Sequence, residues 1–99
     1  MSIDYSIVIP AFNEEDFLST TLTALHEATA QLELSGEIIV VDNNSSDETA
    51  AIAAAQGAQV VFEKINQISR ARNAGAHTAQ GRYLIFVDAD TLVPPALLQ

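Results

Sequence analysis

The stretch EIIVVDNNSSDETAAIAAAQGAQVVFE, residues 37–63, decides the fold because it joins two apolar segments through a helix-forming one. Its aliphatic run ends on Asp42, which is typical of a strand buried on both faces of a sheet. The alanine-rich segment from Thr49 to Gln56 favours a helix, which Gly57 can close in the left-handed conformation. Residues 58–63 predict a second strand. Because parallel strands need a long crossover, which is usually a helix, the stretch predicts a βαβ unit.

The same alternation of strand and helix continues on both sides of this unit. Asn13 precedes three acidic residues and predicts the N-cap of a helix that ends near Gly36. Ser45 and Glu48 have the spacing of a capping box, and Gly81 is a plausible end for a helix before it. The predicted strands are residues 6–10, 37–42, 58–63 and 82–88, and the predicted helices are residues 13–34, 49–56, 66–80 and a last one from Pro94.

The resulting order, βαβαβαβ, predicts one α/β domain over residues 1–99, with a mainly parallel sheet in a three-layer α/β/α, Rossmann-like arrangement. In such sheets a ligand binds at the carboxyl ends of the strands, near the point where the strand order reverses. Polar residues follow three of the predicted strands, and these residues are Asn13, Glu14, Asp42, Asn43, Asp88 and Asp90. We therefore expect a cluster of carboxylates at one edge of the sheet.

The composition limits the kinds of partner, compartment and metal site. Without cysteine, a metal ion here must have oxygen or imidazole ligands. The formal charge of -9 repels a phosphate backbone, so we expect no nucleic acid partner. An acidic protein that binds a diphosphate needs a divalent cation between the two negative surfaces. No apolar run approaches the roughly 18 residues of a membrane span, and we expect a cytoplasmic protein, or one at the cytoplasmic face of a membrane.

The triplet Asp88-Ala89-Asp90 follows an apolar strand, so its two carboxylates should lie at the exposed end of that strand. One carboxylate can hold Mg²⁺ or Mn²⁺, which leave positions open for diphosphate oxygens, and the other can contact a nearby sugar. Taken alone the triplet is a weak signal, and a solvated turn is the simpler interpretation. His26 and His77 fall inside predicted helices, so we expect surface or packing roles for them.

Four motifs occur in a fixed order along the chain. They are IPAFNEE at residues 9–15, VVDNNSSDET at residues 40–49, RARNAG at residues 70–75 and FVDAD at residues 86–90. Together they resemble family 2 glycosyltransferases, over essentially the whole chain. The resemblance implies the A-type fold of nucleotide-diphospho-sugar transferases.

The first motif implies one wall of a nucleotide-sugar site. By resemblance, Pro10, Ala11 and Phe12 line the pocket for the nucleobase and ribose. Glu14 would hydrogen-bond the nucleoside. Because the family often has tyrosine at the position of Phe12, this chain lacks one hydroxyl that could contact the nucleotide.

The other motifs imply the rest of the site. Asp42 matches the family's base-reading carboxylate, which accepts from an N–H of uracil or guanine, although it could instead cap the next helix. Arg72 would contact the base or a phosphate, and a surface ion pair is an equal alternative. Asp88, next to Ala89, would touch the ribose or the metal, and Asp90 would coordinate the metal directly.

The resemblance also implies a reaction, in which an acceptor hydroxyl displaces the nucleoside diphosphate of a UDP- or GDP-sugar with inversion. The acceptor would be a saccharide or a lipid carrier. Mg²⁺ or Mn²⁺ neutralises the leaving group, and a carboxylate base deprotonates the acceptor. In the family this base lies downstream of the Asp-x-Asp motif, so we expect it beyond Gln99 and expect the 99-residue chain alone to be inactive.

Three alternatives to this interpretation differ in class. A non-catalytic binding module could keep the fold without the chemistry. A dehydrogenase would show Gly-x-Gly-x-x-Gly after the first strand, and a nucleotidyltransferase would show a glycine-rich basic loop there; the chain has neither. We also expect a homodimer, because surface that later elements cover in the family would be exposed in this chain.

Overall fold

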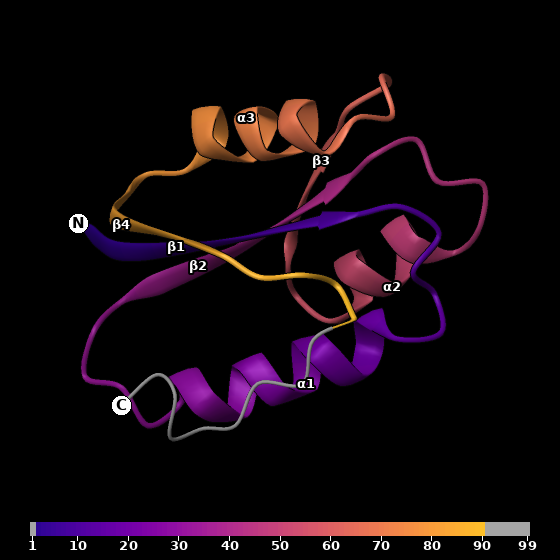
Figure 1. Cartoon of the computed structure of the whole chain (residues 1–99). Helices are drawn as coiled ribbons and strands as arrows, with labels where there is room; N and C mark the ends of the chain where they lie inside the picture. Colours follow the sequence, from indigo (N-terminus) through magenta and orange to yellow (C-terminus); the bar gives the residue numbers. More distant parts are fainter. Residues whose placement is uncertain (1, 91–99) are drawn as a thin grey trace.

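The structure is a computed structural model that describes residues 2–90 of the chain (Figure 1). Strands and helices alternate along these residues, as the sequence predicts. The elements are β1 (Ile3–Ala11), α1 (Leu18–Thr29), β2 (Gly36–Asp42), α2 (Thr49–Ala55), β3 (Gln59–Phe62), α3 (Ile68–Thr78) and β4 (Gly81–Phe86). The helix predicted from Pro94 lies outside the described residues. No helix of residues 2–90 has the length and apolar character that a bilayer crossing requires.

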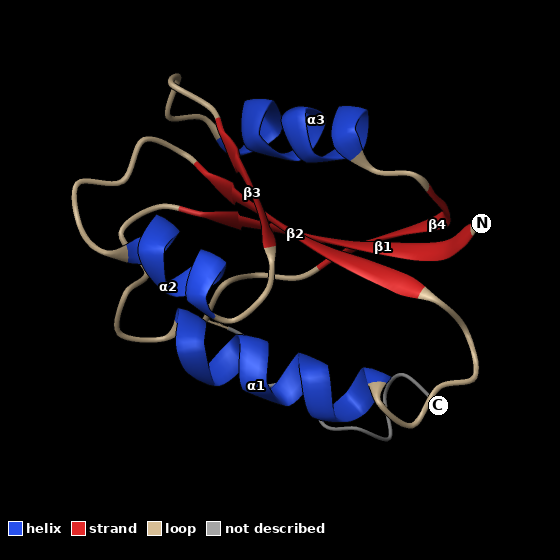
Figure 2. Ribbon diagram, turned by 180° about the vertical axis from the view of Figure 1, so that it is seen from behind, coloured by secondary structure: helices blue, strands red, loops and turns tan. Residues whose placement is uncertain are grey.

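All four strands are parallel and lie in the order β3-β2-β1-β4. Helices α1 and α2 cover one face of this sheet, and α3 covers the other (Figure 1, Figure 2). The predicted three-layer α/β fold is therefore confirmed. The chain adds β2 and β3 on one side of β1 and then returns through α3 to add β4 on the other side. The strand order reverses between β1 and β4, which is where parallel α/β sheets bind their ligands.

The strand register brings the carboxyl ends of the strands to one edge of the sheet. Ala11 at the end of β1 lies opposite Asp42 at the end of β2. β4 pairs with β1 only as far as Val8 and Phe86. Pro10 follows on β1 where this pairing has ended, so its missing N–H removes no hydrogen bond to β4. The proline thus lies in a central strand without disturbing the sheet.

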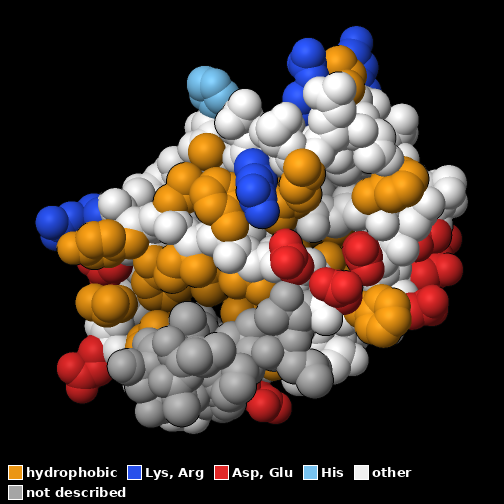
Figure 3. Space-filling model, viewed as in Figure 1, with side chains coloured by type: hydrophobic (Ala, Val, Ile, Leu, Met, Phe, Trp, Pro, Cys, Tyr) orange, Lys and Arg blue, Asp and Glu red, His pale blue; other side chains and the backbone are white. Residues whose placement is uncertain are grey.

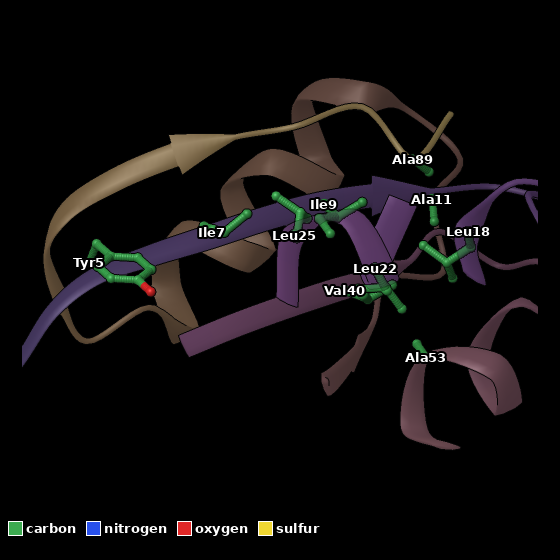
Figure 4. Packing of buried hydrophobic residues seen from close by; sticks show 10 residues of the cluster. All are labelled: Tyr5, Ile7, Ile9, Ala11, Leu18, Leu22, Leu25, Val40, Ala53 and Ala89. Atoms are coloured by element: carbon green, nitrogen blue, oxygen red, sulfur yellow. The ribbon is translucent and has the colours of Figure 1, made fainter. Parts of the chain in front are cut away.

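The larger core lies between the sheet and the helices α1 and α2. It consists of Tyr5, Ile7, Ile9, Ala11, Leu18, Leu22, Leu25, Val40, Ala53 and Ala89 (Figure 4). β1 supplies alternate residues because successive side chains of a strand point to opposite faces, and the leucines of α1 share one helix face. Burial of each large aliphatic side chain stabilises the fold by about 1.5 to 3 kcal/mol. These contacts fix α1 and the start of its preceding loop against the sheet.

A second, smaller core lies under α3 on the opposite face. It consists of Val8, Ile39, Val41 and Ala71. A Cβ atom on Gly75 would lie 2.2 Å from Cγ1 of Val8, so only glycine lets α3 lie this close to the sheet. The helix ends at Thr78, and Gly81 is the first residue of β4 rather than the end of the helix, so that prediction is wrong.

The predicted bounds of the first helix are also wrong. α1 begins at Leu18 rather than at Asn13 and ends at Thr29 rather than near residue 34. Asn13 has a φ of 52°, a left-handed conformation that an N-cap does not normally adopt. Its backbone N–H donates to Ser45 Oγ across the carboxyl edge of the sheet. Tertiary hydrogen bonds therefore hold this segment as a loop despite its local helix signals.

The predicted capping box is wrong for a related reason. α2 does begin at Thr49, close to prediction, but Glu48 at the N-cap position makes no side-chain cap hydrogen bond. Ser45 uses its hydroxyl to accept from Asn13 instead of capping the helix. Gly57 follows α2 with a φ of 83°, which confirms the predicted left-handed closure.

Candidate functional site

A cleft of about 210 Å³ lies at the carboxyl edge of the sheet, where the strand order reverses. Its lining residues are Pro10, Ala11, Phe12, Glu14, Asn43, Asn66, Ile68, Asp88, Ala89 and Asp90. Every residue of the predicted site except Asp42 and Arg72 lines this cleft. Acidic side chains gather on one part of the molecular surface, next to apolar side chains (Figure 3). The predicted gathering of carboxylates at the carboxyl edge is confirmed for Glu14, Asp88 and Asp90.

The Asp88-Ala89-Asp90 triplet is fastened through its middle residue. Ala89 is 3% exposed and belongs to the larger core. Its carbonyl oxygen accepts a hydrogen bond of 2.6 Å from Thr21 Oγ1 of α1. Asp88 and Asp90, on either side of this buried residue, are both exposed and line the cleft. The triplet is therefore anchored rather than a freely solvated turn.

Glu14 reaches the cleft from the loop of residues 12–17, which joins β1 to α1. Its neighbours turn their side chains toward the loop of residues 43–48, which joins β2 to α2. These contacts run from Ser46 N to Asn13 Oδ1 at 2.9 Å and from Glu48 N to Glu15 Oε2 at 3.2 Å. With both flanking side chains anchored to the other loop, the Glu14 side chain is the one that lines the cleft.

The electrostatics of the cleft favour a bound cation. Burial, followed by repulsion from Asp90, Asp47 and Asp88, raises the pKa of the Glu14 carboxyl above its ordinary value. The part of this rise in pKa that comes from the three aspartates reflects repulsion between carboxylates in the absence of a counterion. Positive charge in this cleft would relieve that repulsion, so the site is suited to a divalent ion.

The acidic residues of the cleft suit a metal ion whose remaining coordinating atoms come from the bound ligand. Within residues 2–90, no three His, Cys, Asp or Glu side chains converge closely enough to form a complete metal site. Mg²⁺ and similar ions are usually held by one or two carboxylates together with substrate phosphates and water. Asp88 and Asp90 supply such carboxylates at the wall of the cleft. The donor set is made of oxygen atoms, which suits Mg²⁺ or Mn²⁺.

Asp42 is buried and does not line the cleft, whereas its neighbour Asn43 does. Asp42 is 7% exposed, and its Oδ1 accepts from the Ser45 N–H at 2.9 Å, which closes a turn in the β2–α2 loop but does not cap α2, which begins at Thr49. Asn43 is 4% exposed, and its Nδ2 donates to the carbonyl oxygens of Glu63 at 3.0 Å and Ile65 at 2.7 Å. Both amide hydrogens are thereby engaged, which fixes the side chain and leaves Oδ1 as its hydrogen-bond acceptor.

Arg72 is placed on α3 outside the cleft lining. Its guanidinium carbon lies 5.7 Å from the centre of the Phe86 ring at the end of β4, a cation–π arrangement. His26 bonds the carbonyl oxygen of Gln56 through Nε2, and His77 is in the last turn of α3. Neither histidine lines the cleft, as the sequence predicts.

The sequence places Asn43 at the carboxyl edge without a role in the site, and two lining residues, Asn66 and Ile68, were not predicted. Asn66 and Ile68 come from the junction of β3 and α3, whose position depends on how α3 packs across the sheet. The one local signal is that Ile68, a large apolar residue at the first position of α3, is 57% exposed.

Comparison with known proteins gives a consistent family. Residues 6–99 match the family described as "Glycosyl transferase family 2". An uncharacterised glycosyltransferase of Synechocystis sp. is 39% identical over 99% of this chain and 33% of its own length. The undecaprenyl-phosphate 4-deoxy-4-formamido-L-arabinose transferase of Sodalis glossinidius is 36% identical over 96% of this chain and 32% of its own length. The chain thus spans about a third of the length of these relatives.

Solved structures agree with this result. The mannosyl-3-phosphoglycerate synthase of Rubrobacter xylanophilus superposes with a TM-score of 0.82 at 26% identity, over 92% of this chain and 32% of that one. The glucosyl-3-phosphoglycerate synthase of Mycobacterium tuberculosis, in complex with Mn²⁺, UDP and glucosyl-3-phosphoglycerate, superposes with a TM-score of 0.81 at 25% identity, over 97% and 37% of the two chains. By its fold, its cleft and its sequence, the chain belongs to glycosyl transferase family 2.

Proposed function

We propose that this chain binds the nucleoside diphosphate part of a nucleotide sugar, as part of a glycosyltransferase that inverts the anomeric centre. The observation that carries the proposal is one cleft, at the reversal of strand order, that gathers Glu14, Asp88 and Asp90. Support comes from the Mycobacterium tuberculosis structure, whose described complex contains UDP and Mn²⁺. The donor is a UDP- or GDP-sugar, and the acceptor is a saccharide or a lipid carrier. The Sodalis glossinidius relative is named for a lipid phosphate acceptor of this kind.

Each wall of the cleft has a proposed part in donor binding. Pro10, Ala11 and the half-exposed Phe12 pack against the base and ribose. Asp42 accepts from an N–H of the base, and the neighbouring Asn43, which lines the cleft, offers its Oδ1 as a further acceptor.

The opposite wall of the cleft is acidic. Glu14 hydrogen-bonds the nucleoside, and Asp88 lies between the ribose and the metal. Asp90 holds Mg²⁺ or Mn²⁺ directly. When bound, the cation supplies positive charge to the departing diphosphate. Arg72 remains a proposed phosphate contact from α3.

Isothermal titration with UDP or GDP in the presence of MnCl₂ tests the binding proposal. The wild-type chain should give binding heat that depends on the metal, and Asp90→Ala should abolish it. Glu33→Ala removes an exposed acid from the segment between α1 and β2, at the opposite edge of the sheet, and should bind as the wild type does. Absence of heat for the wild type, or equal heat for Asp90→Ala, would favour a non-catalytic module instead.

Binding without turnover is the second part of the proposal. The chain spans about a third of its relatives, and the base that deprotonates the acceptor is proposed to lie outside these 99 residues. Incubation with UDP-glucose or GDP-mannose and MnCl₂ should release no nucleoside diphosphate above the level of an Asp90→Ala control. Release by the wild type alone would contradict this part.

We also propose that two copies associate through β4. Among the described residues β4 pairs only with β1, so one edge of this strand is open. Tyr83, Leu84 and Phe86 on this strand are 62%, 42% and 43% exposed. Open strand edges with apolar side chains favour pairing with another chain, and two-fold pairing is the commonest outcome. Sedimentation equilibrium should show a dimer that Leu84→Lys weakens; a monomer at high concentration would contradict it.

A cytoplasmic location is proposed from the composition. The chain has no cysteine and an acidic balance, neither of which calls for an oxidising compartment. Cell fractionation with an antibody to the protein should recover it with the cytoplasm or the inner face of a membrane. Recovery from an extracellular fraction would contradict this proposal.

A further inference from the structure

Three successive backbone N–H groups of the β1–α1 loop each donate a hydrogen bond to a side chain of the β2–α2 loop or of the first residue of α2. The bonds run from Asn13 N to Ser45 Oγ at 3.0 Å, from Glu14 N to Thr49 Oγ1 at 3.0 Å and from Glu15 N to Asp47 Oδ2 at 3.2 Å. Because three consecutive N–H groups are bonded to side-chain acceptors, the β1–α1 loop has little freedom to move relative to the β2–α2 loop. The middle bond is the one that fixes the backbone of Glu14, whose carboxylate lines the cleft.

The acceptor of that middle bond is itself held in one orientation. Thr49 is fully buried, and its hydroxyl donates to Asp47 Oδ1 while accepting from Glu14 N. Because the hydroxyl proton is committed to the carboxylate, a lone pair of Oγ1 faces the Glu14 N–H. Asp47 Oδ1 also accepts from the Thr49 N–H at 3.0 Å, and Oδ2 holds Glu15. Asp47 thus ties α2 and the β1–α1 loop together.

The charge state of Asp47 is consistent with this role. Partial desolvation alone would raise the pKa of its carboxyl, but the hydrogen bonds from the Thr49 hydroxyl and from the N–H groups of Thr49 and Glu15 outweigh it. The pKa of Asp47 therefore lies below its ordinary value. A carboxylate that remains ionised keeps all of its acceptor sites available.

We propose that Thr49 and Asp47 are positioning residues for Glu14, and that through it they set the affinity of the cleft for a nucleoside diphosphate with its divalent cation. Neither residue lines the cleft, so both act through the loop. The proposal rests on the binding function proposed above. Loss of the Thr49 hydroxyl would release the Glu14 backbone, and the fraction of molecules with Glu14 in place would fall. Apparent affinity falls in proportion to that fraction.

The test measures binding of UDP with MnCl₂ by isothermal titration. Thr49→Val keeps the shape of the side chain and removes the hydroxyl, and it should weaken binding about tenfold, as a loss of one charge-assisted network would. Thr49→Ser keeps the hydroxyl and should restore affinity to within about twofold of the wild type. Equal affinity for wild type and Thr49→Val would overturn the proposal, as would a Thr49→Ser variant no better than Thr49→Val.

Two controls separate positioning from general loss of stability. Ser6→Ala removes another fully buried hydroxyl, bonded to Glu37 and Gly81 near the amino-terminal end of the sheet, and should leave UDP affinity unchanged. In a Glu14→Gln background, Thr49→Val should weaken binding by less than about twofold, since its effect passes through Glu14. An equal loss of affinity in both backgrounds would overturn the proposal.

A second variant covers the case in which Thr49→Val does not fold. Asp47→Asn is at a partly exposed position and places an amide N–H₂ where the carboxylate now accepts, so UDP affinity should fall about tenfold. Unchanged affinity would overturn the proposal. If the wild type binds neither UDP nor GDP with MnCl₂, the proposed function itself fails; if it binds and these variants bind equally, only the positioning role fails.

Discussion

Gly75→Ala should destabilise the protein, although alanine normally favours a helix. The substitution in a helix interior usually stabilises by about 1 kcal/mol. Here the new Cβ would lie 2.2 Å from Val8 Cγ1 and 3.0 Å from Val41 Cγ2, far inside ordinary contact distance. Overpacking of a core typically costs about 1 to 3 kcal/mol. Val8 is fully buried and β-branched, so it has no easy alternative rotamer. Because an approach of 2.2 Å is severe, we take the upper end of this range, about 3 kcal/mol, and subtracting the helix gain leaves a net loss of about 2 kcal/mol of unfolding free energy.

Urea denaturation followed by circular dichroism measures this loss, with Val8→Ala as the partner of a double-mutant cycle. Val8→Ala removes the nearer clashing methyl group, so Gly75→Ala should then be close to neutral. The coupling energy between the two changes should be about 2 kcal/mol in favour of the double variant.

Two outcomes would refute the close approach of α3 to the sheet. One is a Gly75→Ala variant as stable as the wild type. The other is an equal loss in the presence and absence of Val8→Ala. Because α3 begins at Ile68, which lines the cleft, a displaced α3 should also weaken UDP binding, and the same variants can be titrated to check this.

Three further predictions concern Glu14, Asp47 and Asn43, at or next to the cleft. Glu14→Gln should be more stable than the wild type at pH 7 without metal. Because the pKa of Glu14 is raised in the folded chain, the stabilising contribution of its protonated form is present at low pH and is lost as the pH rises. The difference in urea midpoint between the two proteins should vanish below about pH 4. Asp47→Asn should behave oppositely, less stable at pH 7 and equal to the wild type only once the pH falls below the lowered pKa of Asp47. Asn43→Asp should lower the unfolding free energy by at least about 2 kcal/mol, because the carbonyl oxygens of Glu63 and Ile65 lose their donors. Asn73→Asp, at an exposed position of α3, should change it by less than about 0.5 kcal/mol in the same assay.

The fold could be predicted from the sequence because its signals are local. Apolar runs that end on polar residues mark the strands, and the alternation with helices leaves a parallel sheet as the simple solution. The same logic gave the place of the site, since the acids that follow β1 and β4 had to meet at the carboxyl edge. Glu14, Asp88 and Asp90 meet there.

The misplaced start of α1 and the wrong capping box before α2 have one physical cause. Asn13 and Ser45 each carry a strong local capping signal, but in the structure they use their hydrogen-bonding groups on each other's loops. A side-chain oxygen that can cap its own helix can equally accept from a backbone N–H far away in the sequence. Local propensity does not reveal which partner wins when two loops lie side by side, because the outcome depends on the spacing of β1 and β2.

The same competition between hydrogen-bond partners also distinguishes Asp42 from Asn43. The family resemblance assigns base reading to the carboxylate of Asp42. In the folded chain Oδ1 of Asp42 accepts from the Ser45 N–H and closes a turn, while Asn43 holds the β3–α3 segment and lines the cleft. As a rule, side chains that bond to the neighbouring loop, such as those of Asn13 and Glu15, do not line the cleft, and Asn43, which holds the β3–α3 segment and lines the cleft, is the exception. Glu14, between Asn13 and Glu15, follows the same rule. If this rule holds, affinity for the nucleotide should depend on the anchoring side chains about as strongly as on the residues that touch it.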